Sequence, residues 1–203
     1  MFDLFGKVQD LLLGFGYTAL FAIVFAESGL FFGFFLPGDS LLFTAGLMAS
    51  QGLFDVKIVL VGVAVSAILG DQVGYWMGSK FGRGFFNRPD SIFFNPRHIE
   101  DAEAFYARHG KKTIVLARFV PAVRTFAPIV AGMAHMDYRT FVSYNVLGGV
   151  LWSVVFVLAG YFLGRAFPES GNLIAYIVIA IVLVTTVPIV MEFLKRLKNR
   201  GGR

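Results

Sequence analysis

Apolar residues follow one another along this chain in long segments that short polar stretches separate. A helix of about 20 apolar residues is long enough to cross the hydrocarbon core of a bilayer. The pattern therefore predicts four membrane-spanning helices, at 15–32, 58–79, 140–164 and 172–194. Residues 2–13 place apolar and charged positions on opposite sides of a helix, which predicts an amphipathic helix that lies at the membrane interface or packs on the protein itself.

Two further apolar segments contain residues that interrupt a spanning helix. The first holds Pro37 and Gly38, and the second holds Pro121 and Pro128. Proline removes a backbone donor and clashes with the preceding turn, so both segments should break. Broken backbone at membrane depth is tolerated only inside protein or beside a water-filled cavity. We therefore expect two re-entrant hairpins, at about 33–51 and about 113–135.

The polar stretches predict how the chain is oriented as a single transmembrane domain over residues 1–203. Fourteen of the 18 basic residues fall on one side of the predicted layout, mainly in an interfacial segment at 80–112 and a basic tail at 195–203. Basic residues collect on the cytoplasmic side, so both termini should be cytoplasmic. The two hairpins then enter from opposite faces, and each contains a similar sequence, Ala-Gly-Leu-Met-Ala and Ala-Gly-Met-Ala. This arrangement is typical of an inverted-repeat transporter with a site near the midplane.

The composition supports an all-α polytopic membrane protein. The 203 residues are 57% hydrophobic and only 15% charged, which is more apolar surface than a soluble domain of this size can bury. The absence of cysteine excludes disulfides, a thiolate nucleophile and a thiolate metal site. The net charge of +5 is concentrated in the basic segments, which favours contact with anionic lipids over nucleic acid.

Four charged residues stand out in or beside the hairpins: Glu27, Asp39, Arg118 and Arg124. Each arginine near the middle of a membrane costs about 2.5–3.5 kcal/mol on insertion scales. If the hairpins meet, the acids and the arginines neutralise one another. One interpretation is a purely structural set of ion pairs. The other is a polar cavity in which the arginines bind phosphate oxygens and a carboxylate carries a proton.

Other polar residues are given smaller roles. Asp71 lies in a predicted span and His135 at the exit of the second hairpin, where each is a candidate supporting residue. His98 and His109 are expected at the surface, and the three histidines have no metal-ligand spacing. No serine lies near a histidine in the hairpins, and no phosphate-loop glycine pattern is present. We therefore expect no metal, no cofactor and no catalysis.

Three blocks of this sequence resemble the DedA family of bacterial inner-membrane proteins, which is related to lipid scramblases of the eukaryotic endoplasmic reticulum. The blocks are ESGLFFGFFLPGDSLLFTAGLMA, GDQVGYWMGSKFG and RFVPAVRTFAPIVAGMAHMDYRTFVSYNVLGGVLW. The resemblance implies that the acidic pair and the arginine pair are required for function. Many family members have Glu two residues after the proline of the first block, where Asp39 keeps the charge with a shorter side chain.

The resemblance also implies a function. Family members are linked to proton-dependent translocation of undecaprenyl phosphate, the lipid carrier of cell-envelope synthesis, and some to movement of phospholipids. We expect a flippase that returns this lipid from the outer to the inner leaflet, with Arg118 and Arg124 binding the phosphate and Glu27 and Asp39 coupling it to protons. Moving a phosphate through hydrocarbon unaided costs on the order of tens of kcal/mol, which such a site would offset.

Three alternatives remain open at this point. A phospholipid scramblase would use the same site without proton coupling. A proton-coupled carrier of small ions or osmolytes would need no lateral opening for a lipid tail. A scaffold would use the buried charges only to hold its hairpins together. The sequence does not decide between a monomer and a homo-oligomer.

Overall fold

The structure, a computed structural model, describes residues 2–29, 38–85 and 112–167, without the side chains of 2–13, 82–85, 121 and 122. Every secondary-structure element in these ranges is a helix. In chain order they are α1 (Phe2–Gly29), α2 (Gly38–Ser50), α3 (Val56–Phe85), α5 (Thr113–Ala117), α6 (Pro121–Arg124), α7 (Phe126–Met133) and α8 (Tyr138–Ala166).

Two of the described helices, α3 and α8, are long and apolar enough to cross a membrane, over Val56–Phe81 and Tyr138–Ala166. They occupy the positions of the predicted spans 58–79 and 140–164. Both carry large apolar side chains that are exposed in the isolated chain, including Ile58, Val61, Val65, Leu69, Val146, Val150 and Val154. Apolar surface of this extent requires a lipid or protein environment, as expected of a membrane helix.

Helix α1 is continuous from Phe2 to Gly29. The sequence predicted two elements here, an interfacial helix at 2–13 and a span at 15–32, and the boundary between them is absent. No proline lies in this stretch. The two glycines at the expected boundary, Gly14 and Gly16, each cost a helix only about 1 kcal/mol relative to alanine, so the helix continues through them.

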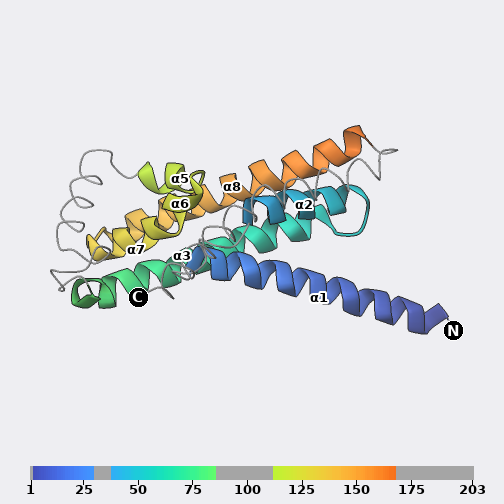
Figure 1. Ribbon diagram of the computed structural model, residues 1–203, viewed down its shortest axis with the longest axis horizontal. Helices are drawn as coiled ribbons and strands as arrows, with labels where there is room; N and C mark the ends of the chain where they lie inside the picture. Colours follow the sequence, from blue (N-terminus) through green and yellow to red (C-terminus); the bar gives the residue numbers. More distant parts are fainter. Residues whose placement is uncertain (1, 30–37, 86–111, 168–203) are drawn as a thin grey trace, which may run out of the picture.

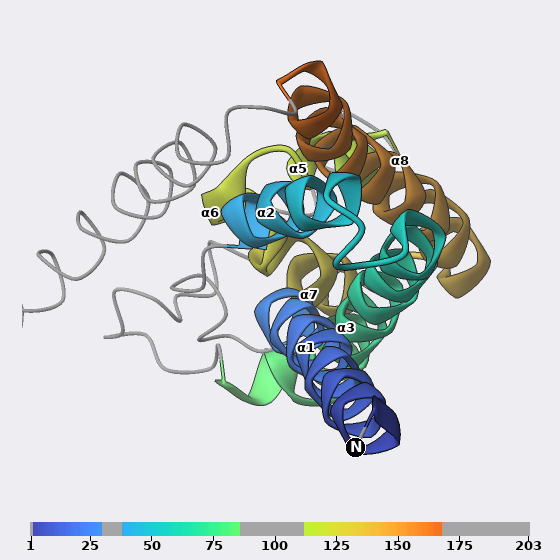
Figure 2. The same ribbon diagram turned by 90° about the vertical axis from the view of Figure 1, so that its right-hand side faces the viewer.

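The short helix of each predicted half packs against the long helix of the other half. α3 and α8 run side by side, and α1 packs on α3 and diverges from it toward the N-terminus (Figure 1). The short helix α2 precedes α3 in the chain but packs mainly along α8. In the same way α7 precedes α8 but packs mainly along α3 (Figure 2). This reciprocal packing agrees with the internal repeat suggested by the sequence, while the opposite membrane orientation of the repeats stays a prediction.

Glycines allow two pairs of helices, α2 with α8 and α3 with α7, to approach each other closely. A Cβ atom would collide with the backbone of the neighbouring helix at Gly46 and Gly160, between α2 and α8, and at Gly78 and Gly132, between α3 and α7. Gly46 and Gly132 are the glycines of the two similar Ala-Gly sequences. The repeated sequence therefore marks the same kind of helix contact in each half, consistent with the role of small residues in membrane helix packing.

The backbone breaks near the prolines of the second segment. Val120 is extended, with φ −114° and ψ 104°, which is the conformation favoured before a proline. Pro121 then begins α6. Proline lacks a backbone N–H, but at the first position of a helix this group has no intrahelical partner in any case. Pro128 lies in the first turn of α7 and cannot donate to the carbonyl of Arg124, which separates α6 from α7.

Several predicted elements lie partly or wholly outside the described residues. The first hairpin is described only from Gly38, where α2 begins, so Pro37 is outside. The interfacial segment at 80–112 is described at its two ends, and the span at 172–194 and the basic tail are outside. The four-span layout and the first re-entrant hairpin therefore stay predictions. The second segment, 113–135, is described and broken into α5, α6 and α7, while its re-entrant path in a membrane stays a prediction.

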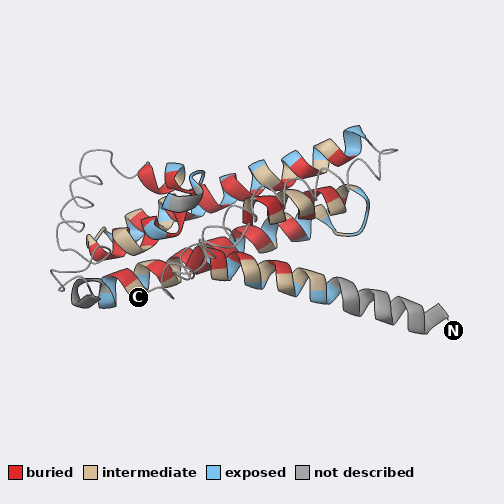
Figure 3. Cartoon of the chain, in the orientation of Figure 1, coloured by how far each residue is buried: buried red, intermediate tan, exposed pale blue. Residues whose placement is uncertain are grey.

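Buried residues concentrate where α1, α2, α3, α7 and α8 meet (Figure 3). Part of this interior is an ordinary apolar core, which includes Val24, Leu42, Val63 and Trp152. The same interior also contains ionisable side chains that are almost completely buried: Glu27, Asp71, Arg118 and Arg124. Charges at this depth are costly unless they are paired, so their partners define the candidate site.

Candidate functional site

Arg124 forms ion pairs with both acids of the first predicted hairpin region. It is the last residue of α6, and its guanidinium contacts Glu27 near the end of α1 and Asp39 in the first turn of α2. The distance from Arg124 Nη1 to Asp39 Oδ1 is 2.5 Å. The side chains of Arg124 and Glu27 are 8% and 2% exposed, whereas that of Asp39 is 27% exposed. One cation is thus shared by two carboxylates, of which only Asp39 has substantial access to the surroundings.

Glu27 is also fixed by the start of α2. The backbone N–H of Gly38 donates to Glu27 Oε1 at 3.1 Å. This N–H belongs to the first turn of a helix, where backbone donors lack intrahelical partners and the dipole favours an anion. A Cβ atom at Gly38 would collide with the Glu27 carboxylate, so any other residue here would displace that carboxylate from its present position. Gly38, which the sequence predicted only as a helix breaker, is therefore also part of the site.

Trp152 completes the Arg124 network from α8. Its indole Nε1–H donates to Asp39 Oδ1 at 2.9 Å. Its ring faces the guanidinium of Arg124, with Arg124 Cζ 4.9 Å from the ring centroid, in a cation–π arrangement. Trp152 is not among the site residues predicted from the sequence. A usable signal was its position: Trp is enriched at membrane interfaces, yet Trp152 lies in the middle of α8.

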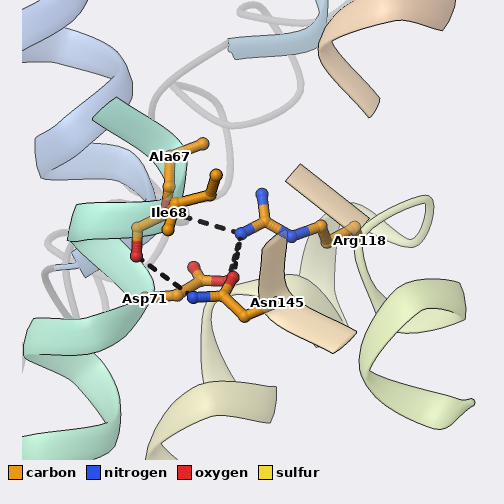
Figure 4. A network of polar contacts seen from close by, with 5 residues as sticks. All are labelled: Ala67, Ile68, Asp71, Arg118 and Asn145. Carbon is orange, nitrogen blue, oxygen red and sulfur yellow. Dashed lines mark hydrogen bonds and ion pairs between the residues drawn. The ribbon is translucent and has the colours of Figure 1, made fainter. Parts of the chain in front are cut away.

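Arg118 belongs to a second network with different partners (Figure 4). Its Nη2 atom forms an ion pair with Asp71 of α3 and donates to Asn145 Oδ1 of α8 at 2.5 Å. The Asn145 Nδ2 atom in turn donates to the backbone carbonyl of Ile68 at 3.1 Å. Asp71, Arg118 and Asn145 are all buried. This network joins the segment after α5 to both long helices.

Two glycines of α8 make room for the Arg118 side chain. A Cβ atom at Gly148 would lie 3.0 Å from Arg118 Cδ, and one at Gly149 would lie 3.5 Å from Arg118 Cζ. The guanidinium therefore lies directly on the α8 backbone. Sequence reasoning missed Asn145, although an amide inside an apolar span is unusual enough to indicate a polar partner nearby.

The structure thus separates the four charged residues that the sequence had combined in one site. Glu27 and Asp39 are both with Arg124, while Arg118 is with Asp71. The two networks contact α8 at Asn145 and Trp152, seven residues or about 10 Å apart along the helix. The other candidate, His135, lies in the exposed turn after α7 with a φ of 49°. His98 and His109 are outside the described residues.

The chemistry of these networks is that of charge pairing. Among the described residues, no group of three or more His, Asp or Glu side chains is arranged to hold a metal ion. A guanidinium presents a rigid fork of donors that matches carboxylate and phosphate oxygens equally well. An anion could therefore take the place of a carboxylate at Arg124.

Long apolar helices with buried charge networks define this chain as a helical membrane protein, and comparison with known proteins agrees. Residues 36–162 match the family model of the VTT domain. The chain belongs to the DedA family. It is 46% identical over 181 residues to Protein DedA of Escherichia coli, covering 88% of this chain and 82% of that protein.

Other relatives are also membrane proteins. An uncharacterized membrane protein of Mycobacterium leprae is 41% identical over 170 residues, covering 84% of this chain and 76% of that protein. The inner membrane protein YqjA of Escherichia coli is 30% identical over 154 residues, covering 76% and 70% respectively. No solved structure matches the chain.

Proposed function

We propose that this protein is a proton-coupled transporter that moves undecaprenyl phosphate from the outer to the inner leaflet of a bacterial inner membrane. The observation that supports the proposal is the sharing of the Arg124 guanidinium between Glu27 and Asp39. The lipid itself is suggested by the resemblance to the DedA family. In this proposal the lipid is moved without chemical change, and both termini are cytoplasmic.

The charge of the Arg124 network links anion binding to protons. With both carboxylates ionised, Glu27, Asp39 and Arg124 together carry a net charge of −1 and repel an anion. Adding a phosphate group to this buried set would raise the negative charge further, which is costly in a medium of low dielectric constant. One proton on a carboxylate removes a competing charge and frees donors of Arg124. Anion binding and proton uptake therefore favour each other, as thermodynamic linkage requires.

Arg124 is the better of the two arginines for contact with the headgroup. Its partner Asp39 is partly exposed, so a ligand has a route to the guanidinium. The side chains of Arg118 and Asp71 are both 5% exposed, and their charges already balance. We assign Arg118 to holding the broken segment against α3 and α8, and Arg124 to binding the phosphate.

Reconstituted transport tests this function. Purified protein in liposomes would be assayed for flipping of a fluorescent polyprenyl phosphate, with and without a pH gradient, beside phosphatidylglycerol and phosphatidylcholine analogues. The proposal expects flipping of the polyprenyl phosphate that increases with the gradient and is absent in empty liposomes. Equal, gradient-independent flipping of all three lipids would instead establish a scramblase. No flipping of the polyprenyl phosphate at any pH would refute the proposal.

A further inference from the structure

We propose that Trp152 is a positioning residue that holds Asp39 against Arg124, so that Asp39, and not Glu27, is the carboxylate that gives way to the anionic headgroup. The proposal rests on the proposed function, and it assigns different roles to two acids that the family resemblance treats as a pair. It follows from three differences between the surroundings of the two carboxylates.

The first difference is the cost of moving each carboxylate. Glu27 accepts a backbone N–H from Gly38, so its departure would leave a buried backbone donor in the first turn of α2 without this acceptor. Its side chain is also 2% exposed, so there is no open direction in which it can move. Among the described residues, the hydrogen bonds of Asp39 come from two side chains, those of Arg124 and Trp152, so its departure takes an acceptor from no backbone donor there.

The second difference is access. A headgroup that approaches Arg124 meets Asp39 before Glu27, because 27% of the Asp39 side chain is exposed. A proton also reaches Asp39 more readily for the same reason. The exchange of Asp39 for a phosphate oxygen at Arg124 Nη1 would conserve the charge-assisted hydrogen bond that the guanidinium makes.

The third difference is the donor from α8. Trp152 is 1% exposed and packs in the apolar core, where its ring centroid lies 6.0 Å from that of Phe156. This packing fixes the position of the indole. An indole N–H donates and never accepts. It therefore favours the ionised form of Asp39, the form that occupies Arg124. Trp152 thus keeps the site closed until Asp39 is protonated.

In the described part of the chain, the polar groups that face Asp39 come from three helices. Arg124 faces it from α6, and Glu27 of α1 lies on the same guanidinium. From α8 the group that contacts it is Trp152, which does not titrate. Removal of the indole N–H leaves both charged neighbours in place, so a change in the proton affinity of Asp39 reports the loss of this donor and not the loss of a charge.

The test is the pair of variants Trp152→Phe and Trp76→Phe. Trp152→Phe keeps an aromatic ring beside Arg124 and deletes the donor. Trp76 is 52% exposed on α3, and its variant is the matched control. We expect Trp152→Phe to shift the pH of half-maximal polyprenyl phosphate flipping upward by about one unit, because hydrogen bonds to charged groups contribute on that scale. Trp76→Phe should leave the profile unchanged. An unshifted profile in Trp152→Phe would overturn the proposal.

A second readout separates this proposal from the proposed function. Infrared difference spectra during a pH titration follow the carbonyl band of a protonated carboxyl group without any transport, and Asp39→Asn identifies the Asp39 band. The Asp39 band should appear at higher pH in Trp152→Phe than in the unaltered protein, even if the lipid substrate is another anion. If Trp152→Phe does not fold, benzothienylalanine at position 152 deletes the N–H at nearly constant volume. An unmoved band in the folded variant would overturn the positioning role.

Discussion

The two buried arginines of this protein differ in how their charges are balanced. Arg118 has one carboxylate partner, Asp71, and a neutral amide from Asn145, and all three side chains are buried. Arg124 has two carboxylate partners, one of which is partly exposed. Both arginines lie in the same broken segment and both contact α8. Their sequence surroundings are similar, so the difference appears only when their partners are known.

In the proposed function, this difference separates structural from functional buried charges. A balanced and closed ion pair holds helices together and gains nothing from a ligand. An unbalanced and partly open network is stabilised by a change of protonation or by exchange of a partner. Burial of the arginine alone therefore does not identify a functional charge in a membrane protein, because Arg118 and Arg124 are buried to a similar extent.

The largest effect is expected from Arg124→Gln. This change removes the only cation that contacts Glu27 and Asp39 in the described residues, so transport should fall to the level of empty liposomes. The exposed Arg165, near the end of α8, supplies the control, since Arg165→Gln should transport at the unaltered rate. Arg124→Gln protein that folds and still flips the lipid would show that Arg124 does not bind the headgroup.

The next largest effect is expected on the free energy of unfolding of the protein when Arg118 or Asp71 is changed. Arg118→Met or Asp71→Leu alone leaves an uncompensated buried charge, which typically costs about 3–5 kcal/mol. The double variant removes both charges and should recover most of this loss, leaving about 1–3 kcal/mol for the Asn145 oxygen without its donor. Denaturant unfolding in detergent measures these differences.

Transport by the same double variant distinguishes the roles of the two networks. With Arg118 and Asp71 both apolar, flipping should remain within several-fold of the unaltered rate. The matched change in the other network, Arg124→Met with Asp39→Leu and Glu27→Gln, also removes every charge and should fold but not flip the lipid. A folded Arg118→Met/Asp71→Leu protein without transport would place Arg118 in the headgroup site, as the sequence alone had predicted.

A smaller effect is expected at the glycine that lets α2, which carries Asp39, approach α8. In Gly46→Ala the new methyl group would collide with the α8 backbone, and overpacking of this kind costs typically about 1–3 kcal/mol. A methyl group added at Gly14 of α1 would have no neighbour within 4 Å, so Gly14→Ala should be neutral or gain up to about 1 kcal/mol. Unfolding of both variants in detergent gives the comparison. Equal stabilities would contradict the close contact between α2 and α8.

The sequence predicted those features that depend on local chemistry. Helices α3 and α8 follow from uninterrupted apolar segments, and the break before α6 follows from Pro121. The helix boundary predicted near Gly14 was wrong, because a glycine weakens a helix without ending it. The pairing of charges could not be predicted, because Glu27, Asp39 and Arg124 are far apart in the chain and no spacing rule relates them.

The residues that sequence reasoning missed have ordinary roles elsewhere. Asn145 and Trp152 occur in an apolar helix, where an amide and an indole more often pack or anchor than complete a charged site. Their function depends on which side of α8 faces the broken segment. That orientation is set by the contacts of α2 with α8 and of α7 with α3, which are tertiary and have no local signal.

Proton uptake on lipid binding tests the central claim most directly. Calorimetric titration with a polyprenyl phosphate in detergent, in buffers of different ionisation enthalpy, measures the protons taken up per lipid bound. We expect net uptake in the unaltered protein and in Arg118→Met/Asp71→Leu, and its loss in Asp39→Asn, which lacks the carboxylate that gives way to the headgroup and keeps only the enclosed Glu27. Uptake that persists in Asp39→Asn, or that disappears in the Arg118 and Asp71 double variant, would contradict the assignment of the two networks.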